Sequence, residues 1–226
     1  DLGEIASLPG VKLEGIFTHF AVADIQDRSF TLEQFRIFKQ FISRLEQRNL
    51  YIPIKHCSNS AAFVEYPETH LDMVRAGIIL YGLYPSSEID RNKLDIIPAM
   101  TFKSRISFIK NLPAGYTISY GRTYCCADQT KVATVPVGYA DGYSRLLSNR
   151  ARAVIKGQEV PLIGNVCMDQ CMFDVSGVEG VKEGDDVILF GRPEHGVTVD
   201  NLAEIMGTIN YEVLCSITSR VPRIYI

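Results

Sequence analysis

Several signals that would direct this chain to a particular environment or partner are missing from its sequence. No window comes near the roughly 18 unbroken apolar residues of a membrane span, and no charged n-region with an apolar h-region opens the chain. The net charge is only -3 at pH 7, so the sequence has no general attraction for nucleic acids or anionic membranes. We therefore expect neither a membrane nor a nucleic acid as a partner.

Metal-ligand spacings and disulfide signals are also scarce. The chain has only 4 histidines, which are scattered, and none of its 6 cysteines belongs to a C-x-x-C pair, so we expect no metal site. A chain of 226 residues with 46% hydrophobic content can build a core without disulfides. The even cysteine count leaves disulfides open, but free, buried thiols in a reducing cytosol are the preferred interpretation.

The first part of the sequence contains an alternation of strand and helix patterns that is typical of a parallel α/β fold. The helix at 31–45 has Thr31 as a plausible N-cap, Gln34 to complete a capping box, and Phe30 and Phe35 as a hydrophobic staple. The predicted elements are strands at 11–21, 51–62 and 71–82, the helix at 31–45, and a short helix stopped before Pro67.

After about residue 96 the pattern changes to short β-branched runs separated by Gly, Pro and Asp turns, which predicts a mostly β domain. One short helix is expected at 198–206, with a Thr cap and a Gly stop. We thus predict a partial β/α barrel over 1–96 and a β-rich domain over 97–226. Three parallel strands leave open edges, and the chain opens without an initiator Met, so we expect that an N-terminal segment is absent.

Polar residues follow each predicted strand, at the carboxyl ends where parallel α/β folds bind ligands. Arg75 interrupts the apolar run LDMVRAGIILYG, and a charge buried there needs a partner, either a structural ion pair or a ligand. Ser60, Gly77 and Ile78 could supply a hydroxyl and two backbone N–H groups to a phosphate. A core glycine and a surface serine would explain the same residues, so both interpretations stay open.

Two further residue types could carry chemistry or could be purely structural. His19 at a strand end is either a satisfied polar residue or a catalytic group that a neighbouring cation keeps neutral. β-Propensity explains most of the tyrosines after residue 115, but Tyr120 lies in the turn SYG, where a phenol can act as an acid or base.

Seven motifs taken together resemble bacterial alanine racemases and cover essentially the whole chain. The resemblance implies a (β/α)8 TIM barrel, of which this chain holds the last three βα units, followed by a mostly β C-terminal domain. It also implies pyridoxal 5'-phosphate (PLP) as cofactor. In chain order the motifs are THFAVAD, HCSNSAA, MVRAGIILYG, ISYGRTY, VGYADGYSR, GNVCMDQ and INYEV with SRVPR.

The resemblance implies that Tyr120, His19 and Arg75 carry catalysis. Arg75 would contact the pyridine nitrogen and leave it unprotonated, which weakens the ring as an electron sink and restrains transamination. His19 would link Arg75 to Tyr120. Tyr120 would be the base for the α-hydrogen of L-alanine in the site of the other subunit, so a homodimer with shared sites is implied.

The remaining site residues follow from the same resemblance. The cofactor phosphate would be held by Ser60, Gly77, Ile78 and Tyr211, with Asn59 close by. Met168 would approach the substrate carboxylate, and Asp24, Tyr139, Arg145, Ile209 and Tyr211 would line the entry corridor. The implied function is interconversion of L- and D-alanine through a PLP imine, which supplies D-alanine for peptidoglycan in the cell wall.

The chain departs from the family in two residues that carry the reaction. The Schiff-base lysine and an arginine near the phenolic oxygen of the cofactor belong to a segment not found here, and neither Lys12 nor Lys55 has the lysine's sequence context. We therefore expect residues 1–226 alone to be inactive. A PLP-binding protein without turnover, a truncated interaction module, and serine as substrate are the alternatives; Tyr120 opposes the first and the bulk of Tyr211 favours alanine over serine.

Overall fold

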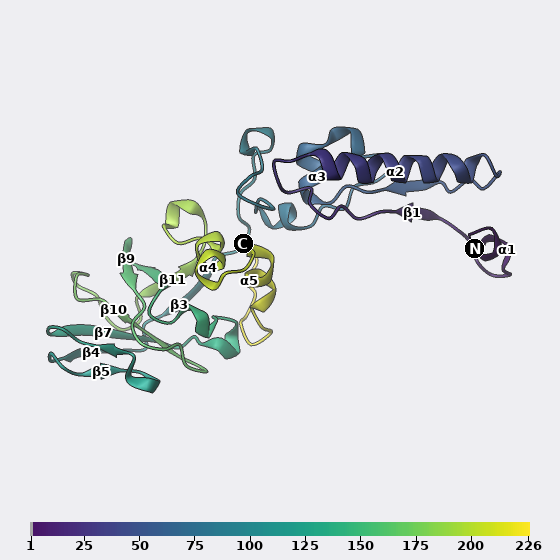
Figure 1. The fold of residues 1–226 in the computed structure, drawn as a ribbon. Helices are drawn as coiled ribbons and strands as arrows, with labels where there is room; N and C mark the ends of the chain where they lie inside the picture. The colour runs from purple at the N-terminus through teal and green to yellow at the C-terminus, as the bar shows by residue number, and fades with distance from the viewer. Residues whose placement is uncertain (1) are drawn as a thin grey trace. The chain divides into compact units, whose positions relative to one another are not determined.

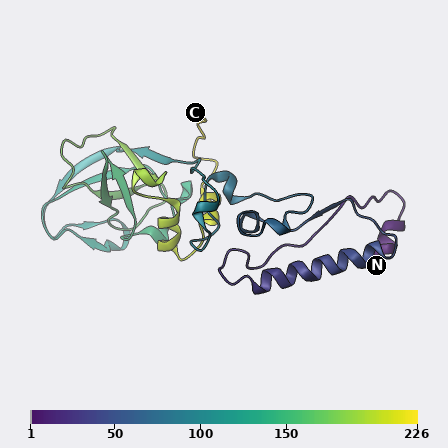
Figure 2. The same ribbon diagram turned by 90° about the horizontal axis from the view of Figure 1, so that it is seen from above.

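The computed structural model describes residues 2–226 and divides into two compact units, Asp1–Ile97 and Pro98–Ile226 (Figures 1 and 2). The secondary structure of each unit agrees with the fold class predicted for it. The first unit mixes helices with parallel strands, and the second is mostly antiparallel sheet. No helix in the described part of the chain is long and apolar enough to cross a membrane.

The first unit is built around two short parallel strands, β1 (Gly15–Phe17) and β2 (Ile54–His56), which pair in register from Gly15 with Ile54 to Phe17 with His56. The long helix of this unit in Figure 1 is α2. The helices are α1 (Leu2–Ser7), α2 (Ser29–Glu46) and α3 (Ser60–Glu65), with 3-10 turns η1 (Pro67–Thr69), η2 (Ile78–Tyr81) and η3 (Arg91–Lys93).

The predicted start of α2 is wrong. The helix begins at Ser29, two residues before Thr31, and the side chain of Asp27 accepts from the Ser29 N–H (2.9 Å). Thr31 is buried and its hydroxyl has no hydrogen-bond partner. Phe30 is 59% exposed, so it makes no staple. Gln34 is used elsewhere, because its amide donates to the carbonyl of His19 (2.7 Å).

The predicted third strand at 71–82 is also wrong. Only one bridge forms there, between Met73 and His56 in a parallel sense, and the chain then continues into η2. Gly82 ends η2 with a left-handed φ of 74°, a conformation that favours glycine. The segment is apolar because Ile78 and Ile79 are buried, at 4% and 8% exposure, and not because it pairs as a strand.

The second unit contains two larger antiparallel sheets and one small ribbon. One sheet has the order β10-β7-β4, the other β3-β11-β8-β9, and β5 pairs with β6. The bounds are β3 Phe102–Arg105, β4 Phe108–Leu112, β5 Thr117–Ile118, β6 Tyr124–Cys125, β7 Thr130–Val135, β8 Arg152–Ile155, β9 Gln158–Pro161, β10 Cys171–Asp174 and β11 Asp186–Phe190.

The core of this unit contains buried side chains from both of its larger sheets. Val132, Phe173 and Phe190 have no exposed surface, and burial of such side chains contributes about 1.5–3 kcal/mol each to folding. All six cysteines are free thiols, but the prediction that they are buried is wrong for Cys125 and Cys215, which are exposed.

Two helices follow the sheets. Helix α4 (Val199–Met206) begins at Thr198, whose hydroxyl accepts from the Asn201 N–H (3.3 Å), and it ends at Gly207, as the sequence predicts. Helix α5 (Asn210–Ser216) was not predicted. It packs against α4, and the two lie side by side in Figures 1 and 2.

Candidate functional site

In the first unit, Arg75 is held between two histidines. Nη1 of Arg75 lies 2.6 Å from Nδ1 of His56, and Nη2 lies 3.0 Å from Nδ1 of His19. Nη2 also donates to the carbonyls of Thr18 (3.2 Å) and Cys57 (3.3 Å). These partners are ring nitrogens and carbonyl oxygens with no carboxylate among them, which opposes the structural ion pair that the sequence left open.

The contacts of Arg75 fix the tautomers of both rings. A guanidinium can only donate, so Nδ1 of His19 and of His56 must each be an unprotonated acceptor, and the ring proton of a neutral imidazole is then on Nε2. For His56, burial and the nearby Arg75 charge lower the pKa, in that order of size, which favours the neutral form. His19 is exposed, so its Nε2–H can donate to a group outside this unit.

A stacked aromatic arrangement supports this cluster from one side. The ring of Phe17 stacks on His56 at 5.2 Å with an interplanar angle of 13°, and the Arg75 guanidinium lies 5.2 Å from the centre of the Phe17 ring. Phe17 and His56 are paired residues of β1 and β2. The parallel pairing of the two strands therefore sets the position of His56 under Arg75. His56, the last residue of β2 and the first of the quoted HCSNSAA motif, is not among the site residues predicted from the sequence.

Two of the predicted phosphate ligands in the first unit, Ser60 and Gly77, are hydrogen-bonded to each other, and Tyr211 belongs to the second unit. The Gly77 N–H donates to Oγ of Ser60 (2.9 Å), so the Ser60 hydroxyl can still donate its own proton. Ile78 is buried at the start of η2. Asn59 is the N-cap of α3 and its Oδ1 accepts from the Ala62 N–H (2.9 Å), which gives Asn59 a structural role.

The two lysines weighed in the sequence have other partners. Nζ of Lys12 lies 2.9 Å from a carboxylate oxygen of Glu14 on the surface. Nζ of Lys55 lies 4.5 Å from the centre of the Tyr51 ring and 3.8 Å from Glu46. Side chains alternate along a strand, so Lys55 and its neighbour His56 leave β2 on opposite faces. Neither lysine belongs to the Arg75 cluster.

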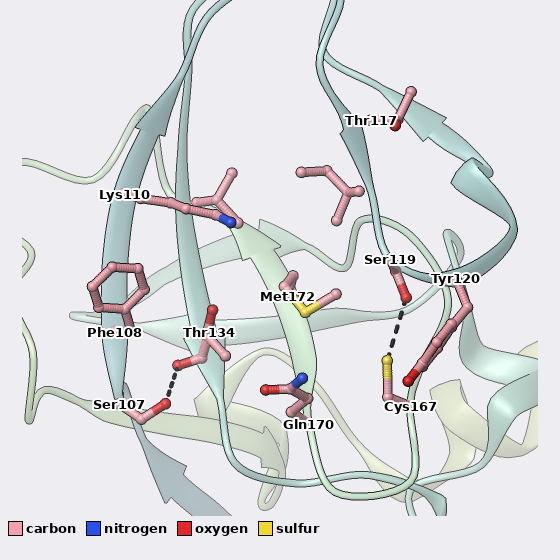
Figure 3. A pocket seen from close by; sticks show the side chains of 12 residues that line it. Ser107, Phe108, Lys110, Thr117, Ser119, Tyr120, Thr134, Cys167, Gln170 and Met172 are labelled. Carbon is pink, nitrogen blue, oxygen red and sulfur yellow. Dashed lines mark hydrogen bonds between the residues drawn. The ribbon is translucent and has the colours of Figure 1, made fainter.

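In the second unit, Tyr120 borders a cavity of about 630 Å³ (Figure 3). Its side chain is 76% exposed. Ser119 precedes it with a left-handed φ of 65°, a strained conformation for a residue with a side chain. The Ser119 hydroxyl lies 3.3 Å from Sγ of Cys167, the contact dashed in Figure 3. The cavity is lined by residues of β4, β5, β7 and β10 together with Tyr120, Cys167 and Gln170.

Met168 and Tyr139 belong to a loop and a turn that lie against each other. The Tyr139 N–H donates to the Cys167 carbonyl and the Ala140 N–H donates to the Met168 carbonyl, both at 3.0 Å. Met168 is 55% exposed and Tyr139 is 44% exposed. Large exposed side chains held by ordered backbone are typical of binding residues.

The other predicted site residues occupy scattered positions within their own units. Arg145 begins the short helix η6 (Arg145–Leu147) and is exposed. Ile209 is the N-cap of α5, is 58% exposed, and precedes Tyr211 in that helix. Asp24 is half-buried in the first unit, and its carbonyl accepts from the Ser86 hydroxyl.

Family models match both units of the chain. The model described as "Alanine racemase, N-terminal domain" matches residues 2–85, and the one described as "Alanine racemase, C-terminal domain" matches residues 99–225.

Curated relatives and solved structures are similar over nearly all of the chain. The chain is 54% identical to an alanine racemase of Clostridium perfringens over 98% of its own length, and 50% identical to one of Desulforamulus reducens over 100%. It spans 58% and 60% of those proteins.

Two solved structures have the same fold. An alanine racemase of Clostridium difficile 630 is matched with a TM-score of 0.94 at 44% identity, over 100% of this chain and 58% of that one. An alanine racemase of Bacillus anthracis with bound L-Ala-P is matched with a TM-score of 0.93 at 36% identity, over 100% and 58%. With family models over both units and half of the residues identical to curated members, the chain belongs to the alanine racemase family.

Proposed function

We propose that the whole protein is an alanine racemase that uses PLP, with residues 1–96 holding the cofactor and residues 97–226 supplying a catalytic tyrosine. The observation that carries the proposal is the guanidinium of Arg75, which is fixed by Nδ1 of His56 and Nδ1 of His19 without a carboxylate. A cation held in this way by neutral acceptors is free to serve a ligand. An arginine whose charge only balanced a buried acid would not be free to bind a ligand.

The donors of the first unit fit PLP. A guanidinium has five N–H donors, and the hydrogen bonds of Arg75 use only those on Nη1 and Nη2, so one on Nε can face a ring nitrogen. Ser60, Gly77 and Ile78 are suited to the phosphate. An added Cβ at Gly77 would meet only Oγ of Ser60, at 3.5 Å, so there is space for a ligand beside this backbone, whose N–H donates to Oγ of Ser60.

PLP when bound supplies a conjugated ring that withdraws electrons from the substrate α-carbon. Arg75 modulates that chemistry, because a guanidinium does not give up its proton at neutral pH and so leaves the neighbouring pyridine nitrogen unprotonated. The ring is then a weaker electron sink, and proton transfer at the α-carbon competes better with transamination. His56 and His19 keep the Arg75 plane in one orientation.

We assign removal of the α-proton of L-alanine to Tyr120, which would act in the site of a second copy of the chain. Two features support a homodimer: Tyr120 is 76% exposed, and Met168 on the same unit is 55% exposed. The Nε2–H of His19 is suited to donate to the phenolic oxygen of the partner's tyrosine, which stabilises its charged form. Arg75 would thereby be coupled to the proton transfer through His19.

The remaining exposed residues suit the handling of a small zwitterion. We assign Met168 to the region of the substrate carboxylate. We also assign Tyr211 to the phosphate and to the entry corridor, and its bulk favours alanine over serine. The corridor itself is assigned to Asp24, Tyr139, Arg145, Ile209 and Tyr211.

The test is formation of D-alanine from L-alanine by the whole protein with added PLP. Arg75→Ala is expected to lower turnover by about 100-fold and to weaken PLP binding followed by absorbance. Arg28→Ala is the matched control, because Arg28 also lies over an aromatic ring, 4.5 Å from the centre of Tyr66, and contacts a backbone carbonyl.

Three outcomes would contradict the proposal. The first is an absence of PLP-dependent D-alanine, and the second is an Arg75→Ala variant equal to Arg28→Ala in turnover and PLP affinity. The third concerns the substrate: L-serine racemised faster than L-alanine would overturn the assignment of alanine.

A further inference from the structure

Arg220 in the C-terminal segment bridges two carboxylates that belong to different parts of the second unit. Its Nη2 lies 2.8 Å from Oδ1 of Asp169, and its Nε lies 3.4 Å from Oδ1 of Asp141. Asp169 directly follows Met168, and Asp141 is two residues after Tyr139. One guanidinium therefore connects the loop that carries Met168 to the turn that carries Tyr139.

The loop and the turn approach each other so closely that no side chain fits between them. A Cβ added at Gly138 would lie 2.2 Å from the Cys167 carbonyl oxygen and 2.3 Å from that of Met168. Asp141 is 8% exposed, and its second oxygen accepts from the Gly138 N–H (2.9 Å). Asp141 thus braces the turn from within and presents its other oxygen to Arg220.

The segment that carries Arg220 is itself fixed to the turn. The Thr218 hydroxyl donates to the carbonyl of Ala140 (2.9 Å), and the Ser216 hydroxyl donates to the carbonyl of Gly142 (3.0 Å). The Thr218 N–H donates to the Asp141 carbonyl (3.2 Å). Arg220 therefore reaches Asp169 from a segment that is hydrogen-bonded to the turn at several points.

The other end of the loop is bonded to the residues around Tyr120. The Asn165 amide donates to the Tyr120 carbonyl (2.7 Å), and the Ser119 hydroxyl donates to the Asn165 carbonyl (2.6 Å). Tyr120, Met168 and Tyr139 are thus presented by one hydrogen-bonded set of segments. Among the described residues of this loop, only Asp169 forms an ion pair with a side chain of the C-terminal segment, that of Arg220.

We propose that Arg220 is a positioning residue, which acts through Asp169 and Asp141 to hold Met168 and Tyr139 at the spacing that the substrate requires. This inference rests on the proposed racemase function. The Arg220 side chain is 52% exposed and that of Asp169 is 59% exposed, and exposed ion pairs contribute little to folding stability. The bridge therefore matters through the positions of Met168 and Tyr139, since a displacement of about 1 Å at a site can lower the rate by about 100-fold.

The chemistry of arginine explains why this position needs it. Its planar guanidinium can present N–H donors to two carboxylates at once, whereas a lysine ammonium is a compact point charge on a flexible stem. The two acids also raise the pKa of Arg220, first through the hydrogen bond that Arg220 donates to Asp169 and then through the Asp141 charge. Lysine in this place would keep the charge and lose the bridge.

The test compares Arg220→Ala and Arg220→Lys with Arg152→Ala in the whole protein. Arg152 is the matched control, because its side chain is 51% exposed and forms an ion pair with Glu159 at 2.9 Å in the same unit. We expect both Arg220 variants to raise KM for alanine by about tenfold with a smaller change in kcat. Their urea midpoints should shift no more than that of Arg152→Ala.

A second readout does not depend on catalysis. The amides of Tyr139 and Ala140 donate to the loop carbonyls, so their hydrogen exchange should accelerate in both Arg220 variants and not in Arg152→Ala. Adding Asp169→Ala to Arg220→Ala should have little further effect, since both changes break one bridge.

The outcomes separate this inference from the function on which it rests. Unchanged KM and unchanged exchange in Arg220→Ala would overturn the positioning role, as would full rescue by lysine. A whole protein that makes no D-alanine, with faster exchange in the Arg220 variants, would overturn the racemase proposal and support the bridge. Faster exchange with an unchanged KM would leave a merely structural bridge, and the positioning role would be wrong.

Discussion

Nη1 of Arg75 donates to Nδ1 of His56 across 2.6 Å, and the two residues come from neighbouring segments that meet at the Met73–His56 bridge. His56 lies at the end of β2, where it is stacked on Phe17. The direction of the Arg75 guanidinium is thus set by a strand pairing. His56 has no assigned contact with the cofactor or the substrate, yet it orients the Arg75 guanidinium.

Replacing His56 by leucine removes the acceptor for Nη1 and leaves Arg75 held mainly by His19 and carbonyls. We expect a fall of about tenfold or more in kcat/KM for alanine and weaker PLP binding, measured by titration in the whole protein. His70→Leu is the control, because His70 is also half-buried and stacks on a phenylalanine, 5.3 Å from Phe63. Equal losses in the two variants would mean that stacking, and not the Arg75 contact, is responsible.

The neutral state of His56 also predicts a pH dependence of stability. Burial and Arg75 lower its pKa in the folded state, below the ordinary value of about 6.5. The unfolded chain then binds the proton first as pH falls, so the stability from neutral His56 is complete above about 6.5 and is lost as pH drops through the folded-state pKa. Urea midpoints between pH 5 and 8 should show this fall in the wild type and a smaller one in His56→Leu. Parallel curves would contradict it.

Replacement of Tyr120 by phenylalanine should slow removal of the α-hydrogen from L-alanine far more than from D-alanine. The phenol is assigned to L-alanine, so solvent exchange of an α-deuterium should slow by about 100-fold or more for L-alanine. Exchange from D-alanine, which depends on the opposed base, should persist. The measurement is deuterium loss from each enantiomer separately, because kcat/KM for racemisation is bound to change equally in both directions.

Tyr116→Phe provides the matched control for that experiment. Tyr116 is 57% exposed in the same unit, and no role in the site is assigned to it. The Tyr116→Phe variant should exchange the α-deuterium of both enantiomers at the wild-type rate. Equal slowing for L- and D-alanine in Tyr120→Phe would remove the assignment of Tyr120 to one face of the substrate.

The sequence allows prediction of the residue types at the site better than of the segments that hold them. Arg75 and Ser60 stand out as candidates because polar residues after apolar runs are informative, and Gly77 stands out because glycine lets a ligand approach the backbone. The run 71–82 was assigned to a strand because a short apolar run does not distinguish strand from helix by periodicity. Only the structure shows that burial, and not pairing, accounts for Ile78 and Ile79.

Other features depend on contacts between residues far apart in the chain. His56 was missed because its role arises from the register of β1 with β2, which no local pattern encodes. Helix α5 has seven residues and no side-chain cap at Ile209, so the usual start signal is absent. Arg220 pairs with residues 79 and 51 positions away, and one sequence contains no signal for such a bridge.

The close contact at Gly138 makes the last prediction, which concerns stability. In Gly138→Ala the new Cβ would lie 2.2 Å from the Cys167 carbonyl oxygen, and backbone cannot yield as a flexible side chain would. We expect a loss of about 3 kcal/mol or more in the free energy of unfolding, measured with urea. Gly177→Ala is the control, since nothing lies within 4 Å of a Cβ there and its φ is not left-handed, so its loss should stay within about 0.5–1 kcal/mol. If Gly138→Ala were as stable as Gly177→Ala, the loop that carries Met168 could not rest on the turn that carries Tyr139, and the bridge made by Arg220 would have nothing to hold in place.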